Sequence, residues 1–206
     1  MRVETGLALV VAAYLLGSVS FSYLIVKLKE GRDVRTVGSG NAGATNVLRA
    51  SGPGAAVLAL LLDVAKGVTA VLGTRLLEAP PPVVGGAAFA VVLGHVFPIF
   101  FGFRGGKGVA TSAGALGALE PTAMLATLAV FIAVVAWKRY VSLGSVVAAL
   151  VFPLLAWTGH RLGWISSDPS VVVASAAIAS LILFRHRSNL ARLRRGAEPR
   201  LGERAA

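Results

Sequence analysis

The chain alternates between long apolar blocks and short polar gaps. A helix that spans a lipid bilayer needs about 20 mostly apolar residues, and most of these blocks approach that length. The blocks cover residues 6–26, 54–76, 83–101, 109–119, 121–137, 143–157 and 171–184. The pattern predicts an all-α polytopic membrane protein with seven transmembrane helices, formed by a single domain over residues 1–206. The fourth block is the shortest of the seven.

The composition excludes a water-soluble domain. Of the 206 residues, 56% are hydrophobic and 14% are charged, whereas about a quarter of the residues in a soluble domain are charged. The mean hydropathy is +0.78. The first block begins at Gly6 and is longer than the apolar core of a signal peptide, so we expect it to be retained as a helix.

The basic residues predict an orientation. If successive gaps lie on alternate sides, sixteen of the twenty Lys and Arg residues fall on one side and three on the other, with Lys66 inside a helix. Cytoplasmic loops are enriched in these residues. We therefore expect the N-terminus outside and the basic tail, from Arg185 to Arg204, in the cytoplasm. The net charge of +11 is then loop charge, and nucleic-acid binding is not expected.

The residue types also narrow the chemistry. The chain has no cysteine, which excludes disulfides, thiolate metal sites and a thiol nucleophile. His95, His160 and His186 fall in separate segments without the spacing of metal ligands. No metal and no cofactor are therefore expected.

The first of three polar segments on the predicted cytoplasmic side lies between the first two helices. Its glycines let backbone N–H groups converge on an anion. Its candidate ligands for phosphate are Gly38, Ser39, Gly40, Asn41, Gly43, Thr45 and Arg49. Thr45 or Asn46 is suited to cap a following helix. The segment contains a formal GxGxxG, but no strand precedes it, so a dinucleotide site is not supported. A flexible loop is the alternative.

The second segment follows Gly-His-Val-Phe-Pro at residues 94–98 and is rich in glycine. It resembles a phosphate-binding loop without matching the Walker A spacing, so nucleotide binding is unsupported. The candidates for an anion cradle are Arg104, Gly105, Gly106, Lys107 and Gly108. The alternative is a basic loop whose charges only set the topology.

The third segment opens the basic tail. His186 and Asn189 are three residues apart and would share one face of a helix. A basic tail is otherwise a lipid-headgroup anchor. At the start of the sixth block, Ser142 and Ser145 are suited either to cap a helix or to donate to a phosphate.

Asp63 and Lys66 are three residues apart inside the second block. Charges at such depth are costly unless they are paired, so we expect a neutralising pair with a structural role.

Five segments, taken in chain order, resemble the bacterial acyl-phosphate:glycerol-3-phosphate acyltransferase family. They are Gly-Ser-Gly-Asn-Ala-Gly-Ala-Thr-Asn with Arg49, Asp-Val-Ala-Lys-Gly, Gly-His-Val-Phe-Pro with Gly-Phe-Arg-Gly-Gly-Lys-Gly-Val-Ala-Thr, Tyr-Val-Ser-Leu-Gly-Ser, and His-Arg-Ser-Asn-Leu with Glu198. The resemblance covers essentially the whole chain. Leu190 departs from the family pattern, where isoleucine is usual.

The resemblance implies a multi-pass enzyme of phospholipid biosynthesis in the bacterial plasma membrane, with its active site at the cytoplasmic face. It would transfer a fatty acyl group from acyl phosphate to the 1-hydroxyl of sn-glycerol 3-phosphate, giving 1-acyl-glycerol 3-phosphate (lysophosphatidic acid) and phosphate. Its partners would be these substrates and membrane lipid, with no obligatory protein partner.

The resemblance also implies roles for particular residues. Ser39 and Arg49 of the first segment and His186 and Asn189 of the third would be functional in catalysis. The glycine-rich second segment would bind glycerol 3-phosphate, and Glu198 would be structural.

Acyl phosphate is already an activated mixed anhydride, so positioning and charge neutralisation would be the main tasks of the protein. We expect direct attack by the glycerol hydroxyl, without an acyl-enzyme. The proton would pass to a phosphate oxygen of the donor or to His186. A Ser–His–Asp triad has little support, because Asp63 is expected to pair with Lys66.

Two alternatives from other classes have less support. A transporter or channel for an organic anion would place polar groups near the bilayer midplane, often in repeated halves, and the chain shows no internal repeat. A CDP-alcohol transferase would need a carboxylate-rich metal motif, and the chain has only nine Asp and Glu residues.

Overall fold

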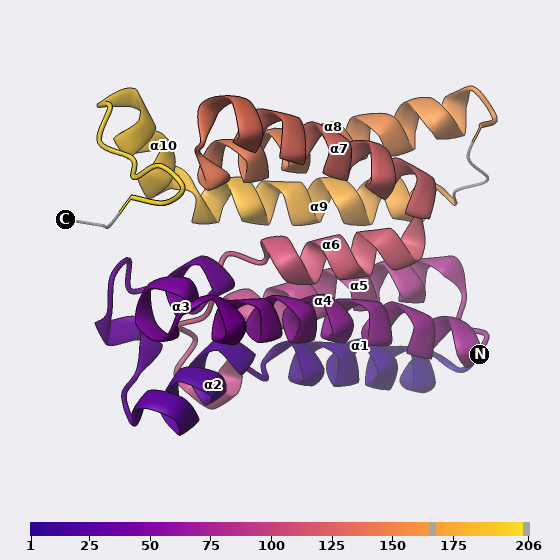
Figure 1. Cartoon of the computed structure of the whole chain (residues 1–206). Helices are drawn as coiled ribbons and strands as arrows, with labels where there is room; N and C mark the ends of the chain where they lie inside the picture. The colour runs from indigo at the N-terminus through magenta and orange to yellow at the C-terminus, as the bar shows by residue number, and fades with distance from the viewer. Residues whose placement is uncertain (165–167, 204–206) are drawn as a thin grey trace.

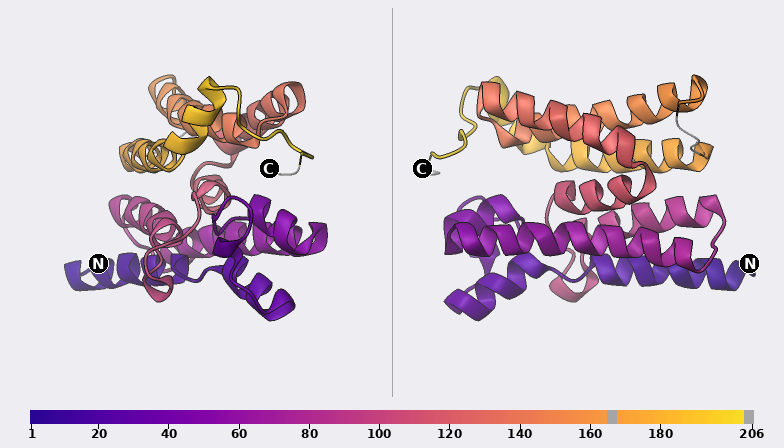
Figure 2. Two further views of the ribbon diagram at one scale, coloured as in Figure 1. Left: turned by 90° about the vertical axis from the view of Figure 1, so that its left-hand side faces the viewer. Right: turned by 45° about the vertical axis from the view of Figure 1, so that its right-hand side comes forward.

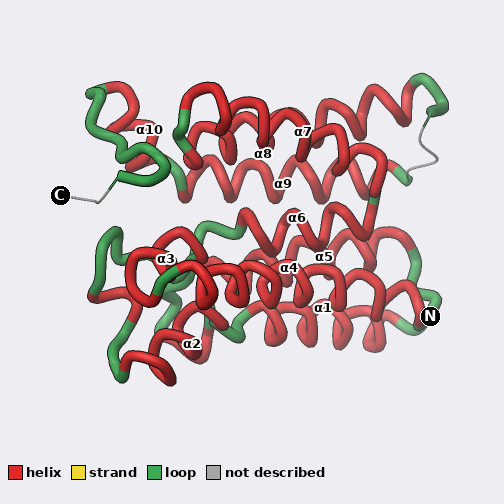
Figure 3. Tube along the Cα trace, viewed as in Figure 1, coloured by secondary structure: helices red, strands yellow, loops and turns green. Residues whose placement is uncertain are grey.

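The computed structural model describes residues 1–164 and 168–203, and every regular element in these ranges is a helix (Figure 3). The elements are α1 (Val3–Gly17), α2 (Phe21–Glu30), η1 (Val34–Thr36), α3 (Ala44–Ser51), α4 (Pro53–Leu76), α5 (Pro81–Val96), η2 (Ile99–Phe101), α6 (Val109–Leu119), α7 (Pro121–Lys138), α8 (Val141–Arg161), α9 (Pro169–Arg185) and α10 (Arg187–Arg194). The predicted all-α class is confirmed. Arg204 of the basic tail lies outside the described residues.

Five helical stretches of the described chain are long and apolar enough to cross a membrane. They are Val3–Glu30, Pro53–Leu76, Pro81–Phe101, Pro121–Lys138 and Val141–Arg161. Helices α9 and α10 meet at a bend of 55° and together form a sixth candidate. Helix α6 is apolar but has only 11 residues. The seven predicted helices therefore correspond to five or six candidate spans and one shorter apolar helix.

The first apolar block is not the continuous helix that the sequence predicts. Helix α1 ends at Gly17 and α2 begins at Phe21. Where a helix stops in apolar surroundings, its last carbonyls need donors from elsewhere. Lys66 of α4 supplies them, because its ammonium group donates to the carbonyls of Gly17 (3.0 Å) and Val19 (2.8 Å). Hydropathy misses this break because the stabilising donor lies on another helix.

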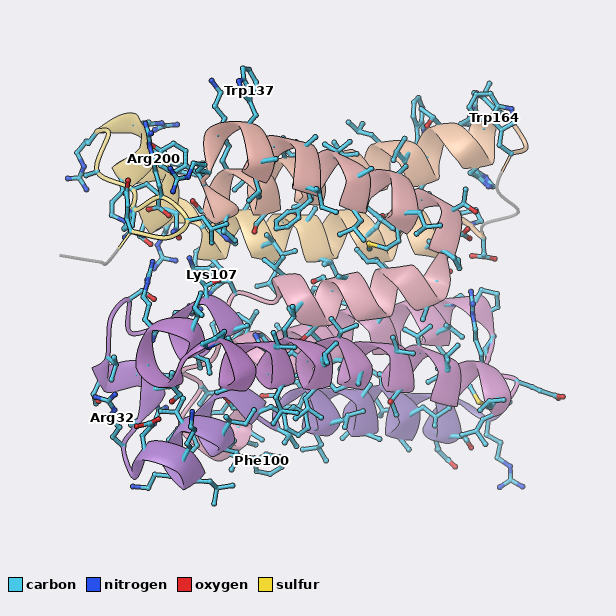
Figure 4. The ribbon with its side chains drawn as sticks, in the orientation of Figure 1. Arg32, Phe100, Lys107, Trp137, Trp164 and Arg200 are labelled. Atoms are coloured by element: carbon cyan, nitrogen blue, oxygen red, sulfur yellow. The ribbon has the colours of Figure 1, made fainter. Side chains whose placement is uncertain are left out.

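The long helices form two layers (Figures 1 and 2). Helices α1, α4 and α5 lie in one layer and α7, α8 and α9 in the other, while α6 lies between them and contacts α4, α5, α7 and α9. The short helices α2, α3 and α10 gather at the end of the bundle opposite the N-terminus, which we call the polar end. Figure 4 shows Arg32, Lys107 and Arg200 at the polar end and Trp164 at the other.

Reciprocal glycines bring neighbouring helices close together. A Cβ atom on Gly67 of α4 would lie 2.2 Å from the carbonyl oxygen of Thr111 on α6. In return, a Cβ atom on Gly114 of α6 would lie 2.0 Å from the carbonyl oxygen of Val64 on α4. Helices α1 and α5 approach in the same way. Small residues at such crossings are typical of helix packing in membranes.

We predict that Gly114→Ala lowers the free energy of unfolding by about 1–3 kcal/mol, the usual cost of an overpacked methyl group. Gly73→Ala on α4 is the matched control, because a Cβ atom there meets nothing within 4 Å. The control should be neutral or stabilise by up to about 1 kcal/mol, since alanine favours helix over glycine. Thermal unfolding of the purified protein in detergent measures both variants. Equal losses would contradict the close-packing explanation.

Candidate active site

Residues of all three polar segments line one cavity at the polar end of the bundle. The cavity, which we call the basic pocket, has a volume of about 220 Å³. It is lined by Ser39, Gly40, Asn41, Lys107, Arg185, Arg187, Ser188, Asn189 and Arg192. Four of these nine residues are cationic and none is acidic. The structure thus brings together segments that lie almost 150 residues apart in the chain.

Asn46 organises the first segment. Its buried side chain donates from Nδ2 to the carbonyls of Val34 and Val37, both at 2.9 Å, and its Oδ1 accepts from the backbone N–H of Ser39 at 3.0 Å. The predicted capping role of Asn46 or Thr45 is therefore wrong, since the N-cap of α3 is Gly43. Local sequence suited Asn46 to a cap, whereas its actual partners precede it by 7 to 12 residues.

Two further features fix the first segment. Gly38 has a φ of +54°, and a Cβ atom there would lie 2.5 Å from Asn46 Oδ1, so a larger residue would be strained and would displace the Asn46 side chain. Arg35 donates to the carbonyl of Phe101 at 2.8 Å and to both carboxylate oxygens of Asp33. The first segment is thereby tied to the loop that precedes the second.

The second segment folds back onto the end of α5. The backbone N–H of Gly105 donates to the carbonyl of Val96 (3.2 Å), and that of Gly106 donates to the carbonyl of His95 (3.1 Å). This turn presents Lys107, whose ammonium group donates to Asn189 Oδ1 at 2.5 Å. The second and third segments are therefore in direct contact.

Asn189 also forms a hydrogen bond with the tail. Its Nδ2 donates to Glu198 Oε1 at 2.6 Å, while Arg192 donates from Nε to Glu198 Oε2 at 2.7 Å. Burial raises the pKa of Glu198, but the hydrogen bonds from Asn189 and Arg192, with the Ser142 hydroxyl nearby, outweigh burial and hold that pKa below its ordinary value. Glu198 is thus an anion that supports Asn189 and Arg192 without lining the basic pocket.

The surroundings of Lys107 make it a titratable group near physiological pH. Burial lowers the pKa of its ammonium group to about 8, and the positive charges of Arg192, Arg185 and Arg49 act in the same direction. Glu198 opposes them. At pH 7 Lys107 is therefore mostly charged, but it loses its charge within two pH units above that.

His186 lies at the bend between α9 and α10 and is only 2% exposed. Its Nδ1 is 2.8 Å from the carbonyl oxygen of Ile182. A carbonyl can only accept, so Nδ1 carries the proton of the neutral ring and Nε2 keeps a free lone pair. Asn189 is also buried, at 4% exposure. Both residues predicted to share a face therefore point into the protein.

Of the predicted anion ligands in the first two segments, only Ser39, Gly40, Asn41 and Lys107 line the basic pocket. The others do not, and they are Gly38, Gly43, Thr45, Gly105, Gly106, Gly108, Arg49 and Arg104. Arg104 is exposed and lines a separate cavity of about 720 Å³ together with Arg35 and Tyr23. Arg49 is exposed in the last turn of α3, and its Cδ lies 3.4 Å from where a Cβ atom of Gly38 would be. Arg49 therefore lies beside Gly38 but outside the lining of the basic pocket, while Arg104 lines the other cavity.

The predicted capping role of Ser142 and Ser145 is also wrong. The N-cap of α8 is Tyr140, and both serines are buried within the helix. Ser145 donates to the carbonyl of Val141 in its own helix at 2.8 Å. Ser142 lies beside the carboxylate of Glu198. Neither serine lines the basic pocket.

Asp63 and Lys66 form the expected neutralising pair, with 2.9 Å between Lys66 Nζ and Asp63 Oδ1 and side chains that are 1–2% exposed. A third residue was not foreseen: His95 Nδ1 lies 3.4 Å from the same carboxylate oxygen.

The sequence also left Arg185, Arg187 and Arg192 as tail charges. Their proximity to Asn189 in the chain was the available signal, but it does not separate a ligand from a headgroup anchor.

Residues 7–196 match the family described as Glycerol-3-phosphate acyltransferase. A relative with that description from Halalkalibacterium halodurans is 46% identical over 206 residues, with 97% of each chain covered. Another, from Bordetella pertussis, is 45% identical over 200 residues, which cover 95% of this chain and 92% of the relative.

Two crystal structures of PlsY (YgiH), an integral membrane glycerol 3-phosphate acyltransferase, are similar to the whole chain. The glycerol 3-phosphate form has a TM-score of 0.89 and 42% identity, and 96% of each chain is covered. The lysophosphatidic acid form has a TM-score of 0.86 and 40% identity with the same coverage.

We predict that the basic pocket binds a phosphate monoester such as ethyl phosphate, with an affinity that falls above pH 8. The monoester is a dianion throughout that range because its second pKa is about 6, so the change reports on the protein. Affinity should fall about tenfold per pH unit as Lys107 loses its proton.

Lys107→Arg is the matched control, because a guanidinium group stays protonated throughout this range. Its binding should not decline between pH 7.5 and 9.5, whatever its absolute affinity. Isothermal titration calorimetry in detergent measures both proteins. A flat profile for the wild type would contradict anion binding by a Lys107 whose pKa is about 8.

Proposed function

The chain belongs to the glycerol-3-phosphate acyltransferase family, and from this premise we propose that its acyl donor is acyl phosphate. It is a glycerol-3-phosphate acyltransferase that produces lysophosphatidic acid. In the proposed reaction, a fatty acyl group passes from acyl phosphate to the 1-hydroxyl of sn-glycerol 3-phosphate, and inorganic phosphate leaves. Because the chain belongs to this family, the transporter and CDP-alcohol transferase alternatives are no longer supported.

The observation that carries the proposal is the composition of the basic pocket. Both proposed substrates bear a phosphate group, and the pocket has four cationic side chains and no acidic one. Guanidinium groups bind phosphate oxygens in pairs, and an ammonium group adds a compact charge. In the proposed arrangement Lys107 binds the phosphate of glycerol 3-phosphate. The first segment, at Ser39–Asn41, holds the phosphate of the donor, with Arg49 beside it.

The proposed chemistry is direct transfer. The 1-oxygen of glycerol 3-phosphate attacks the acyl carbon, the bond from that carbon to the phosphate oxygen breaks, and phosphate leaves with the electron pair. The hydroxyl proton passes either to a donor phosphate oxygen or to Nε2 of His186, whose lone pair is free when Nδ1 donates to Ile182. Cationic side chains around the pocket offset the charge that develops on the phosphate.

The surroundings of Ser39 favour a role as a donor over a role as a nucleophile. Its backbone N–H is fixed by Asn46, and its side chain is exposed at the pocket. A serine nucleophile needs a base that is held in place by a third group. Asp63 is already occupied by Lys66 and His95, so it is not available for that purpose.

We predict that the purified protein, given acyl phosphate and glycerol 3-phosphate, releases lysophosphatidic acid and phosphate in equal amounts. Because direct transfer requires both substrates at once, initial rates should give the intersecting pattern of a ternary complex. Without glycerol 3-phosphate there should be no burst of phosphate and no acylated protein in mass spectra.

Each part of the proposal can fail separately in this assay. A protein that uses acyl coenzyme A but not acyl phosphate would overturn the donor. A parallel-line pattern together with an acylated peptide would overturn direct transfer and leave the acyltransferase activity in place.

The chain is an integral, multi-pass membrane protein. We further propose that it lies in the bacterial plasma membrane with the polar end in the cytoplasm. Support comes from the basic side chains at that end, since cytoplasmic loops are enriched in Lys and Arg. An N-terminus at the opposite end of the bundle agrees with an odd number of crossings (Figure 1).

The absence of native cysteine makes this orientation directly testable. We predict that a membrane-impermeant maleimide labels Trp164→Cys in intact spheroplasts, and labels Arg32→Cys and Arg200→Cys only after permeabilisation. All three positions are exposed and lie at the ends that Figure 4 shows. Labelling of Arg32→Cys in intact spheroplasts would contradict the proposed orientation.

A further inference from the structure

Three buried polar residues, Asp63, Lys66 and His95, meet between α4 and α5; we call them the buried triad. The Asp63 carboxylate oxygen Oδ1 lies 2.9 Å from Lys66 Nζ and 3.4 Å from His95 Nδ1. Their side chains are only 1–6% exposed. Polar groups at such depth are costly in a membrane protein and usually have a function. None of the three lines the basic pocket.

The buried triad contacts the polar segments in two places, which we call its arms. The first arm contacts the break between α1 and α2, which precedes the first polar segment. Lys66 donates to the carbonyls of Gly17 and Val19, between α1 and α2. A cation at the end of a helix also stabilises its negative pole. Asp63 holds this ammonium group in place. The direction in which α2 leaves the bundle, toward the loop that carries Ser39, therefore depends on Lys66.

The other arm reaches the second segment one residue before Lys107. A Cβ atom on Gly106 would lie 2.1 Å from His95 Nε2 and 2.8 Å from the carbonyl oxygen of Ala42. The Gly106 backbone is thus held between the His95 ring and the first segment. His95 also accepts the Gly106 N–H at its own carbonyl. The orientation of the imidazole, which faces Asp63 through its other nitrogen, sets the position of this turn.

We propose that the buried triad is a positioning device that fixes the two phosphate-binding segments relative to each other. Asp63 orients Lys66 toward the helix break and His95 toward the glycine turn. Displacement of either arm moves Ser39 relative to Lys107. Displacement of the His95 arm moves Lys107 itself and thereby weakens the binding of glycerol 3-phosphate. The inference rests on the proposed role of Lys107 in binding the substrate phosphate.

A contact between one glycine and one imidazole can be tested by suppression. Gly106→Ala places a methyl group against the end of the His95 side chain, and its dissociation constant for glycerol 3-phosphate should rise about ten- to hundredfold, as expected for a displaced binding group. In the double variant His95→Ala, Gly106→Ala the clash with the imidazole is removed, whereas the contact of the added methyl group with the Ala42 carbonyl oxygen remains, so recovery is partial. The double variant should therefore bind more tightly than Gly106→Ala alone.

Gly105→Ala is the matched control. A Cβ atom on Gly105 would lie 2.0 Å from the backbone carbonyl oxygen of His95, which remains when the side chain is removed. Adding His95→Ala to Gly105→Ala should therefore give no recovery. Binding is measured by isothermal titration calorimetry, and thermal unfolding is measured in parallel. Where His95→Ala does not fold, His95→Gln replaces it, because a flexible amide can turn away from the added methyl group while it keeps a polar group near Asp63.

The outcomes decide between positioning and mere structural support. Recovery with Gly106→Ala but not with Gly105→Ala supports the proposal. Recovery of neither or of both, or a His95→Ala protein that unfolds earlier but binds glycerol 3-phosphate as the wild type does, would overturn it. Unchanged binding by Lys107→Met would overturn its premise. Binding without turnover of acyl phosphate would overturn only the proposed donor.

Discussion

Four positive side chains around a cavity of about 220 Å³ repel one another, and the arrangement of the polar end follows from that constraint. Glu198 supplies a compensating negative charge, but it acts from behind, through hydrogen bonds from Asn189 and Arg192. The carboxylate therefore relieves the repulsion without competing with an anion for the cavity. The remaining repulsion lowers the pKa of Lys107, to which burial contributes most. A phosphate dianion in the pocket would take the place of the water that these side chains lost on burial. Its negative charge would offset their positive charge.

Holding such a pocket at the end of a helical bundle requires loops that do not move under this repulsion. Long-range hydrogen bonds meet the requirement. Asn46 binds three backbone groups of the first segment, and Arg35 ties that segment to Phe101. The glycine turn is anchored by its own N–H groups on the last carbonyls of α5. Several of these bonds reach backbone groups at a helix end or a turn, such as the carbonyl of Phe101 and the last carbonyls of α5, so the same contacts that keep the loops ordered also shape the pocket.

The contrast between correct and incorrect predictions has a physical origin. A membrane-spanning helix satisfies its own backbone hydrogen bonds and must be apolar, so local composition was sufficient to place helices in all seven blocks. The break after Gly17 escaped because its donor, Lys66, lies almost 50 residues further along the chain. Asn46 was assigned to a cap because the local rule for caps fits it, and its real partners were invisible to that rule. Arg185 was counted as a topology signal, since charge alone does not distinguish a pocket from a membrane surface. Spacing did reveal the pair of Asp63 and Lys66, because three residues on a helix place two side chains on one face.

The placement of the carboxylates argues for the kind of catalysis that this architecture supports. Asp63 and Glu198 are both turned toward cations or amide groups of the protein, and neither lines the basic pocket. General base catalysis by a carboxylate is thus not what the site is built for, and a carboxylate at the pocket would weaken its affinity for phosphate. With the proposed acyl phosphate donor such a base is not needed, because the leaving phosphate would itself carry oxygens that accept a proton. The protein then contributes position and positive charge, and both depend on contacts behind the pocket. In such an enzyme the residues that determine the rate extend beyond those that touch substrate, to the side chains that hold the loops at their relative distance.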